Sequence, residues 1–205
     1  MIKIGIVDYG VGNLKSIFNA FNYLGLEIEF INNPINIKKY DKIVLPGVGS
    51  FKYCMERIKL TNFDEEIKNF VTNKKMLLGI CVGMQMLCSS SSEDGLTDGF
   101  NFFKEKVEKF NLNEVASNRI PHIGFNSIYP DSNSKLFKNF NEKADFYFIH
   151  SYRVKTNNEK KFYSYFNYGE KFVSSLEKDN IYGVQFHPEK SQLNGIKLFH
   201  NFAKI

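Results

Sequence analysis

The 205-residue chain contains no tryptophan and has only three cysteines and five prolines. Cys54, Cys81 and Cys88 form neither an even set nor a Cys-x-x-Cys pair, which argues against a disulfide framework and favours a reducing compartment. The longest nearly apolar run, residues 76–88, is too short to span a bilayer and contains Gln85. The first residues show no secretory signal pattern. We therefore expect a cytoplasmic protein with no membrane segment.

Positive charge is not concentrated in any part of the chain. The formal net charge is +5, but lysine and arginine are scattered and no block of five basic residues occurs. Signatures of RNA-binding modules are missing as well, so we expect no nucleic-acid partner. The hydrophobic fraction of 43% is too high for a disordered chain. The length suits one sizeable core, and we expect a single domain over residues 1–205.

In the first half, short apolar segments alternate with stretches whose apolar residues recur at helical spacing. Such alternation predicts an α/β fold with a doubly wound, mostly parallel sheet. The expected strands are 2–7, 27–32, 43–45 and 76–80, and the expected helices are 14–24 and much of 50–74.

The second half has strand-like segments in quick succession, which indicates an antiparallel extension of the sheet. A Ser-, Glu-, Asp- and Gly-rich stretch at 88–98 is the best candidate for a loop, and residues 191–203 predict a closing amphipathic helix. The expected strands of this half are 121–129, 145–154, 161–166, 171–177 and 181–186.

Residues 79–83 read Gly-Ile-Cys-Val-Gly, a pattern typical of a sharp strand-to-helix turn that presents a nucleophile. Glycines on either side permit the close chain approach of such a turn. The Cys81 sulfur would then lie at a strand's carboxyl end and at a helix N-terminus, which favours the thiolate. The Val82 N–H would be free to hold an oxyanion. The competing interpretation is a small buried apolar side chain, which we prefer for Cys54 and Cys88.

A cysteine nucleophile needs a base, and His187 is the best candidate. Pro188 disfavours helical conformation at His187, so the segment should be extended. Residues two apart in an extended segment share a side, which would place Glu189 behind the imidazole to orient it. The competing interpretation is a surface turn with an incidental histidine and glutamate.

Residues 46–49, Pro-Gly-Val-Gly, follow a short apolar strand. Their glycines allow backbone N–H groups to point into a cavity, so one of these amides could join Val82 in an oxyanion hole. A phosphate-binding loop competes here and at residues 10–12, Gly-Val-Gly. Neither segment fits a nucleotide-binding fingerprint.

The remaining histidines are His122, His150 and His200. We expect His200 in the closing helix, at the surface or the edge of the core. His122 and His150 could contact a substrate or partner, although no pattern pairs them with Cys81. No two histidines have metal-site spacing, so we expect no metal and no cofactor.

Several motifs in this order resemble the class I (triad) glutamine amidotransferases, and most closely the glutaminase subunits of imidazole glycerol phosphate synthase. The similarity extends over nearly the whole chain. The motifs are DYGVGN at 8–13, PGVG at 46–49, GICVGMQ at 79–85, PHIGFN at 121–126, HSY at 150–152 and FHPEK at 186–190.

The resemblance implies a flavodoxin-like domain in which Cys81 attacks the side-chain amide of L-glutamine. His187 would act as base and then acid, with Glu189 orienting it. The Val82 amide would hold the oxyanion together with an amide of the 46–49 loop, for which Val48 is the expected donor and Gly49 the other candidate.

The same resemblance assigns substrate contacts to four further residues. Gln85, one helical turn after Cys81, would hydrogen-bond the bound glutamine. Glu93 would read the substrate α-amino group, and Ser151 and Tyr152 its carboxylate end. For Gln85 and Glu93, an exposed helix residue and a solvated loop charge are the competing interpretations.

Members of this family dock on a (β/α)₈ synthase that takes up the ammonia, and their activity depends on that partner. Asn13, Phe125 and Lys190 match the docking face. Phe125 stands where histidine-pathway members usually carry tryptophan, and phenylalanine lacks the indole N–H.

Five functional classes stay open at this point, one of them being the other triad glutaminases of the family. The first is histidine biosynthesis, and the second is a related glutaminase that feeds amidation of a surface sugar. A non-catalytic scaffold is disfavoured because Cys81, His187 and Glu189 are all present. A cysteine peptidase or γ-glutamyl hydrolase is disfavoured by Gln85 and the 46–49 loop.

Overall fold

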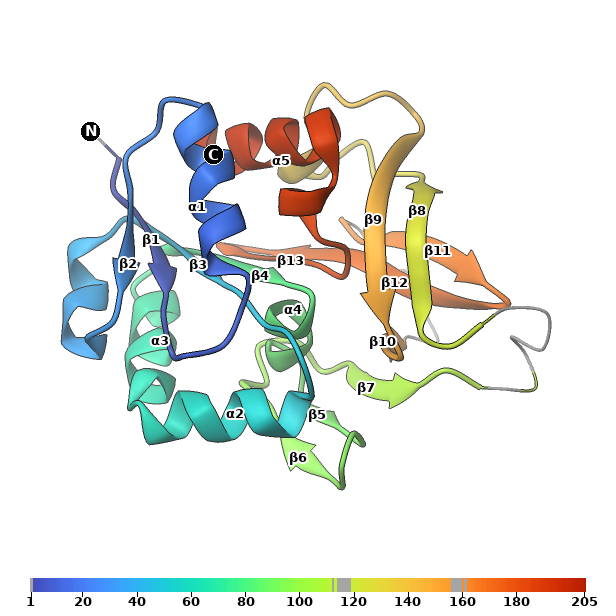
Figure 1. Cartoon of the computed structure of the whole chain (residues 1–205), viewed down its shortest axis with the longest axis horizontal. Coiled ribbons are helices and arrows are strands. Elements are labelled where there is room, and N and C mark those ends of the chain that lie inside the picture. Colours follow the sequence, from blue (N-terminus) through green and yellow to red (C-terminus); the bar gives the residue numbers. More distant parts are fainter. Residues whose placement is uncertain (1, 112, 114–118, 156–159, 161) are drawn as a thin grey trace.

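The computed structural model describes residues 2–111, 113, 119–155, 160 and 162–205. Its centre is a long sheet whose first half is parallel, with strand order β2-β1-β3-β4-β13 (Figure 1). This order is the flavodoxin-like one, so the expected doubly wound, mostly parallel fold is confirmed. The strands are β1 (Ile4–Val7), β2 (Ile28–Ile31), β3 (Lys42–Leu45), β4 (Met76–Ile80) and β13 (Ile181–Val184).

Helices cover both faces of the parallel half (Figure 1). On one face α1 and α5 pack together, with the rings of Phe21 and Phe199 4.6 Å apart. The other face carries α2, α3 and the short α4, which leads directly from the end of β4. Their bounds are α1 (Leu14–Tyr23), α2 (Phe51–Leu60), α3 (Phe63–Thr72), α4 (Val82–Met86) and α5 (Gln192–Lys204).

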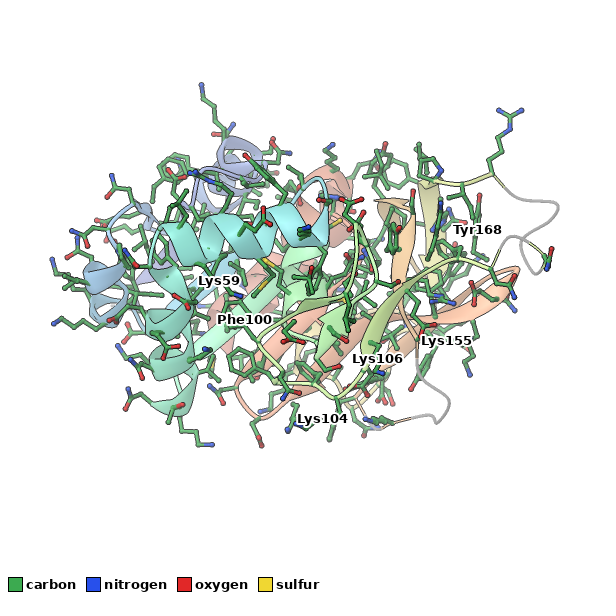
Figure 2. The ribbon with its side chains drawn as sticks, turned by 90° about the horizontal axis from the view of Figure 1, so that it is seen from below. Lys59, Phe100, Lys104, Lys106, Lys155 and Tyr168 are labelled. Carbon is green, nitrogen blue, oxygen red and sulfur yellow. The ribbon has the colours of Figure 1, made fainter. Side chains whose placement is uncertain are left out.

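Beyond β13 the sheet continues as β12-β10-β7-β5-β6, with β11 paired to β12 and antiparallel pairing for all but β5 with β7. Figure 2 shows this end from below, with Lys106 of β7 opposite Lys155 of β10. The strands are β5 (Ser90–Ser91), β6 (Thr97–Asp98), β7 (Lys106–Lys109), β10 (Tyr152–Lys155), β11 (Ser164–Tyr168) and β12 (Glu170–Lys178).

A separate antiparallel hairpin of β8 (His122–Ile128) and β9 (Ala144–His150) stands beside this extension. Three 3₁₀ segments complete the described elements, and the last contains three residues of the FHPEK motif. These segments are η1 (Pro34–Lys39), η2 (Lys135–Phe137) and η3 (Pro188–Lys190).

Three local expectations were wrong. The expected strand 145–154 is two strands, because β9 pairs only with β8 whereas β10 pairs with β7 and β12. Ser151 is the break between them. The expected loop 88–98 contains the short pair β5 and β6, and β7 was not predicted. For the expected strand 161–166, residue 161 lies outside the described residues, and β11 starts at Ser164.

Glycines at the carboxyl ends of β3 and β4 let the two turns that follow these strands pack backbone to backbone. A Cβ on Gly47 would lie 2.5 Å from the Gly83 nitrogen, and one on Gly79 would lie 2.7 Å from the Gly83 oxygen. A Cβ on Gly83 would lie 2.0 Å from the Leu45 oxygen. The 46–49 loop and the start of α4 are therefore in direct contact at the point where β4 ends.

The close contact at Gly83 predicts a large stability loss for Gly83→Ala. Alanine is the better helix former, so a loss must come from the clash with the Leu45 carbonyl. We expect the free energy of unfolding in urea to fall by about 3 kcal/mol. Gly5→Ala is the matched control, because its Cβ would meet the movable Ile31 side chain, and about 1 kcal/mol is expected. Equal losses in the two variants would contradict the backbone-contact interpretation.

Candidate active site

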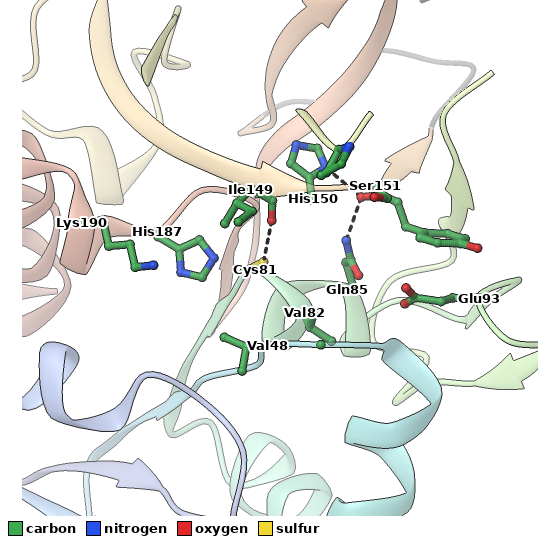
Figure 3. Close-up of a pocket in the computed structure, with 13 residues that line it drawn as sticks. Val48, Cys81, Val82, Gln85, Glu93, Ile149, His150, Ser151, His187 and Lys190 are labelled. Carbon is green, nitrogen blue, oxygen red and sulfur yellow. Dashed lines mark hydrogen bonds between the residues drawn. The ribbon is translucent and has the colours of Figure 1, made fainter. Parts of the chain in front are cut away.

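A cavity of about 310 Å³ opens at the carboxyl ends of β3 and β4, between the turns just described and the β9–β10 segment (Figure 3). Ten of the thirteen sequence-predicted site residues line it, whereas Glu189, Asn13 and Phe125 do not. Its walls are Val48, Gly49, Cys81, Val82, Gln85, Glu93, Pro121, Ile149, His150, Ser151, Tyr152, His187 and Lys190.

Cys81 is held in a backbone conformation that L residues rarely adopt, with φ 55° and ψ −112°. Such strain persists only where the surroundings over-determine it, and it is frequent at functional sites. Val82 begins α4, where the first N–H groups have no acceptor within the helix. The turn therefore presents the Cys81 side chain to the cavity with an adjacent backbone donor, as the Gly-Ile-Cys-Val-Gly pattern predicts.

His187 lies beside Cys81 in the cavity (Figure 3). Glu189 contacts the other side of the ring. The backbone of His187 is extended (φ −102°, ψ 96°), and its Nδ1 is 2.8 Å from Glu189 Oε1. Both side chains are almost fully buried. This arrangement leaves Nε2 as the ring nitrogen that faces away from the carboxylate.

Burial disfavours a charged His187, but the Cys81 sulfur and the Glu189 carboxylate outweigh it. Together they raise the pKa of His187 from 6.5 to about 10. At neutral pH the ring is therefore protonated, as the partner of a thiolate would be. Because this pKa is raised in the folded protein, the pair stabilises the fold fully below about pH 6.5 and loses that contribution as pH rises through about 10.

Gln85 is buried at the base of the cavity, which excludes its interpretation as an exposed helix residue. Its Nε2 donates to the Tyr152 carbonyl at 3.0 Å and to Gln185 Oε1 at 3.0 Å. Glu93 lies on the opposite side of Gln85 from Cys81 in Figure 3. One of its oxygens accepts the Phe51 N–H at the start of α2 at 2.7 Å. Burial raises the pKa of Glu93, partly offset by this bond.

The 46–49 loop is tied down from two sides. The buried Tyr9 hydroxyl donates to the Pro46 carbonyl at 2.7 Å, so the first glycine-rich loop supports the second. The Cys54 thiol donates to the Val48 carbonyl at 3.4 Å. Val48 and Gly49 both line the cavity, whereas Cys54 is buried behind them in α2.

The three residues expected at a partner interface are connected by contacts around the cavity rim. Asn13 Nδ2 donates to Glu189 Oε1 at 3.5 Å, so it also touches the carboxylate behind His187. Lys190 Nζ lies 5.6 Å from the centre of the Tyr147 ring, and the Phe125 ring lies 5.5 Å from the same ring. Phe125 is half-exposed at the surface of the hairpin.

Sequence reasoning missed the roles of His122 and His150. They face each other in the β8–β9 register, with Nδ1 of His122 3.0 Å from Nε2 of His150. His150 Nδ1 donates to the Tyr152 carbonyl at 2.8 Å. Burial lowers the pKa of His122 to about 4, and burial and His122 lower that of His150 to about 3. Only the strand pairing brings the two together, so no local sequence signal could have found this neutral pair.

Within the described ranges, no group of three His, Cys, Asp or Glu side chains could hold a metal ion. None of the helices described is long and apolar enough to cross a membrane.

The pKa of His187 predicts a specific response to Glu189→Gln. Glutamine keeps an acceptor for the ring N–H but removes the charge, so the pKa of His187 should fall by about one to three pH units. An NMR titration of the imidazole follows this directly. Glu56→Gln, which removes an exposed carboxylate from α2, is the charge-matched control. If the pKa of His187 is the same in both variants, the Glu189 carboxylate does not raise it.

Comparisons with known proteins agree with this geometry. The family described as Glutamine amidotransferase class-I matches residues 5–205. Imidazole glycerol phosphate synthase subunit HisH 1 of Campylobacter jejuni subsp. jejuni serotype O:23/36 (strain 81-176) is 45% identical, covering 98% of this chain and 100% of that protein. Subunit HisH of Sulfurimonas denitrificans (strain ATCC 33889 / DSM 1251) is 41% identical, with 98% and 97% covered.

Solved structures share the fold at low sequence identity. A glutamine amidotransferase crystal structure superposes with a TM-score of 0.75 at 14% identity, covering 98% of this chain and 97% of that one. The glutaminase domain of Trypanosoma brucei CTPS with bound acivicin gives 0.65 at 14%, covering 100% and 94%. With the family match and the full-length relatives, the chain belongs to the class-I glutamine amidotransferases and, within them, to the HisH subunits of imidazole glycerol phosphate synthase.

Proposed function

We propose that this chain, acting as one domain over residues 1–205, is the glutaminase subunit of an imidazole glycerol phosphate synthase. It hydrolyses L-glutamine to glutamate and ammonia and needs no cofactor. The observation that carries the proposal is the strained Cys81 turn in the same cavity as a buried His187, whose Nδ1 lies 2.8 Å from Glu189.

The reaction follows from these three side chains. The Cys81 thiolate adds to the carbon of the substrate amide, and the carbonyl oxygen takes up the negative charge. The C–N bond then breaks, and the leaving nitrogen takes a proton from His187 and departs as ammonia. Neutral His187 next accepts a proton from water, which attacks the thioester and releases glutamate and the Cys81 sulfur.

Backbone amides at the cavity would hold the oxyanion. Val82 supplies the first, at the start of α4. The bond from Cys54 points the Val48 carbonyl toward α2, and in a trans peptide the following N–H points the opposite way. This orientation favours Gly49 as the second donor in the present conformation, whereas the Val48 N–H would be used after a rearrangement of the loop.

The polar groups along the cavity are arranged in a way that suits the three functional groups of free glutamine. The reactive amide would lie at Cys81, and the Glu93 carboxylate beyond Gln85 would take the α-ammonium group (Figure 3). Ser151 and Tyr152 line the cavity beside them and would take the carboxylate end. Gln85 would then contact the substrate between its side-chain amide and its α-amino end. The Gln85 Nε2 already donates hydrogen bonds to the Tyr152 carbonyl and to Gln185.

Ammonia must reach a second active site before it is protonated in water, so a synthase partner is part of the proposal. We place a (β/α)₈ synthase on the rim that carries Asn13, Phe125 and Lys190. Asn13 touches Glu189, and Lys190 lines the cavity, so docking there would act directly on the catalytic residues.

Covalent labelling tests the glutaminase proposal. A diazoketone analogue of glutamine should alkylate Cys81 in the complex with the synthase, because the thiolate attacks the analogue as it would the amide. Peptide mass spectrometry locates the label. Cys81→Ser should lose the label and at least about 10³-fold in glutamine hydrolysis, whereas Cys54→Ser should keep both. Failure to label Cys81 even with the partner present would reject the proposal.

The synthase complex also tests the pathway and the docking face. With the histidine-pathway synthase and its acceptor, glutamine hydrolysis should rise well above that of the isolated chain. Activation only with a sugar-amidating synthase and its acceptor would instead support the alternative that Phe125, in place of tryptophan, leaves open.

Phe125→Ala should weaken association with the synthase by about tenfold or more, because a half-exposed aromatic is a typical interface anchor. Calorimetric titration measures the affinity. Leu60→Ala removes an apolar side chain that is even more exposed, at the C-terminal end of α2, and should leave the affinity unchanged. The same weakening in both variants would place the interface elsewhere.

A further inference from the structure

Gln185 is a buried polar residue that the reaction described above does not use. It follows β13, two residues before His187, and its side chain is inaccessible to solvent. Its Nε2 lies 3.8 Å from the Cys81 sulfur, within the range of an N–H···S hydrogen bond. Its backbone N–H donates to the Ser174 carbonyl of β12 at 2.9 Å, so the residue is anchored by the sheet.

The orientation of the Gln185 side-chain amide can be deduced from its contact with the Gln85 amide, which in turn contacts the Tyr152 carbonyl. The Tyr152 carbonyl can only accept, so the Gln85 group 3.0 Å away must be its NH₂. The same NH₂ group lies 3.0 Å from the Gln185 side chain, which must therefore present its oxygen. The NH₂ group of Gln185 then remains for the sulfur. Backbone chemistry thus determines both amide orientations.

The Tyr152 carbonyl is held in position by a second hydrogen bond. The Tyr152 carbonyl also accepts from His150 Nδ1 at 2.8 Å, and Nε2 of that ring is directed at His122. The low pKa values keep both rings neutral, so the carbonyl is shared by a neutral imidazole and the Gln85 amide. The position of the carbonyl is thereby fixed from two directions.

We propose that Gln185 is a further catalytic residue, which donates a hydrogen bond from Nε2 to the Cys81 thiolate. The inference rests on the proposed function, because it requires Cys81 to act as a thiolate. In the strained turn, the sulfur shares the cavity with the His187 ring and lies 3.8 Å from the Gln185 amide nitrogen. It also lies 4.0 Å from the Ile149 carbonyl, to which only the protonated thiol can donate. A buried anion without enough donors is costly, and bonds to charged groups are stronger than neutral ones.

The Gln185 donor has a second consequence for the reaction. When His187 passes its proton to the leaving ammonia, the imidazolium charge beside the sulfur is lost. The Gln185 amide is uncharged and does not titrate, so its donor persists through both halves of the reaction. It would again stabilise the thiolate when the thioester is hydrolysed and the sulfur leaves.

The decisive experiment measures the thiolate without glutamine. The rate of Cys81 alkylation by iodoacetamide is followed from about pH 6 to pH 9, on the full chain alone and in its synthase complex, with mass spectrometry to locate the label. Gln185→Leu should slow alkylation about 10- to 100-fold at neutral pH. It should lower kcat for glutamine by a similar factor in the complex while changing KM little.

Gln185→Glu provides a second variant of nearly the same size. Its carboxylate still accepts from the Gln85 amide but offers no donor to the sulfur once ionised. Its alkylation deficit, relative to the parent chain, should grow as pH rises and shrink as the carboxyl gains a proton. A purely structural role would not produce this pH dependence. Ser174→Ala, which removes a buried hydroxyl from the neighbouring strand, is the control and should react at the parent rate.

The outcomes separate the two proposals. If the parent Cys81 is not alkylated, both the glutaminase chemistry and the thiolate bond are rejected. If the parent reacts and Gln185→Leu reacts equally fast, only the Gln185 proposal is overturned. A raised KM with unchanged alkylation would also overturn it, because Gln185 would then merely hold Gln85 in place.

Discussion

The structure depends on the strained backbone of Cys81, which is held by glycines packed against backbone atoms at the carboxyl ends of β3 and β4. A side chain at Gly47, Gly79 or Gly83 would collide with backbone atoms that cannot move away. A positive φ at a non-glycine residue costs roughly 1–3 kcal/mol, so the turn is stable only because this packing leaves the chain no other course. The same packing brings the 46–49 loop next to the start of α4. The positions of Cys81 and of the backbone N–H groups beside it are therefore consequences of one close contact.

The charges around this turn are arranged so that only one histidine is ionised. Glu189 and the Cys81 sulfur raise the pKa of His187 to about 10, although the ring is buried. His150 borders the same cavity but faces His122 and a backbone carbonyl, and burial lowers its pKa to about 3. Two rings in one pocket thus differ in charge because of their immediate partners. The protonated ring lies beside Cys81, whereas the neutral one bonds the Tyr152 carbonyl of the segment that lines the cavity.

The two halves of the sheet contribute different parts of the site. The parallel half supplies the turns that carry Cys81 and His187, as expected for the carboxyl ends of strands in an open α/β sheet. The extension and the β8–β9 hairpin supply the opposite wall, including Ser151 and Tyr152, and the exposed Phe125. Because one hairpin carries both cavity-lining and exposed residues, a partner bound outside would be mechanically close to the substrate. Two further residues of the expected docking face are connected to the cavity. Lys190 of the FHPEK motif lines it, and Asn13 donates to Glu189 of the same motif.

Features that are local along the chain could be predicted from the order of the amino acids. Alternating segments indicated the doubly wound sheet, flanking glycines indicated the Cys81 turn, and Pro188 made His187 extended with Glu189 on its side. These inferences held because they depend on φ and ψ preferences and on the positions of strand ends. Which distant segments come into contact could be seen only in the folded structure. In the folded chain Gln85 is buried and Glu93 accepts a hydrogen bond from the Phe51 N–H. The expected strand is interrupted at Ser151, and the Gln185 amide lies 3.8 Å from the Cys81 sulfur. Such contacts follow from packing and strand register between separate elements, which a single sequence does not encode in any local pattern.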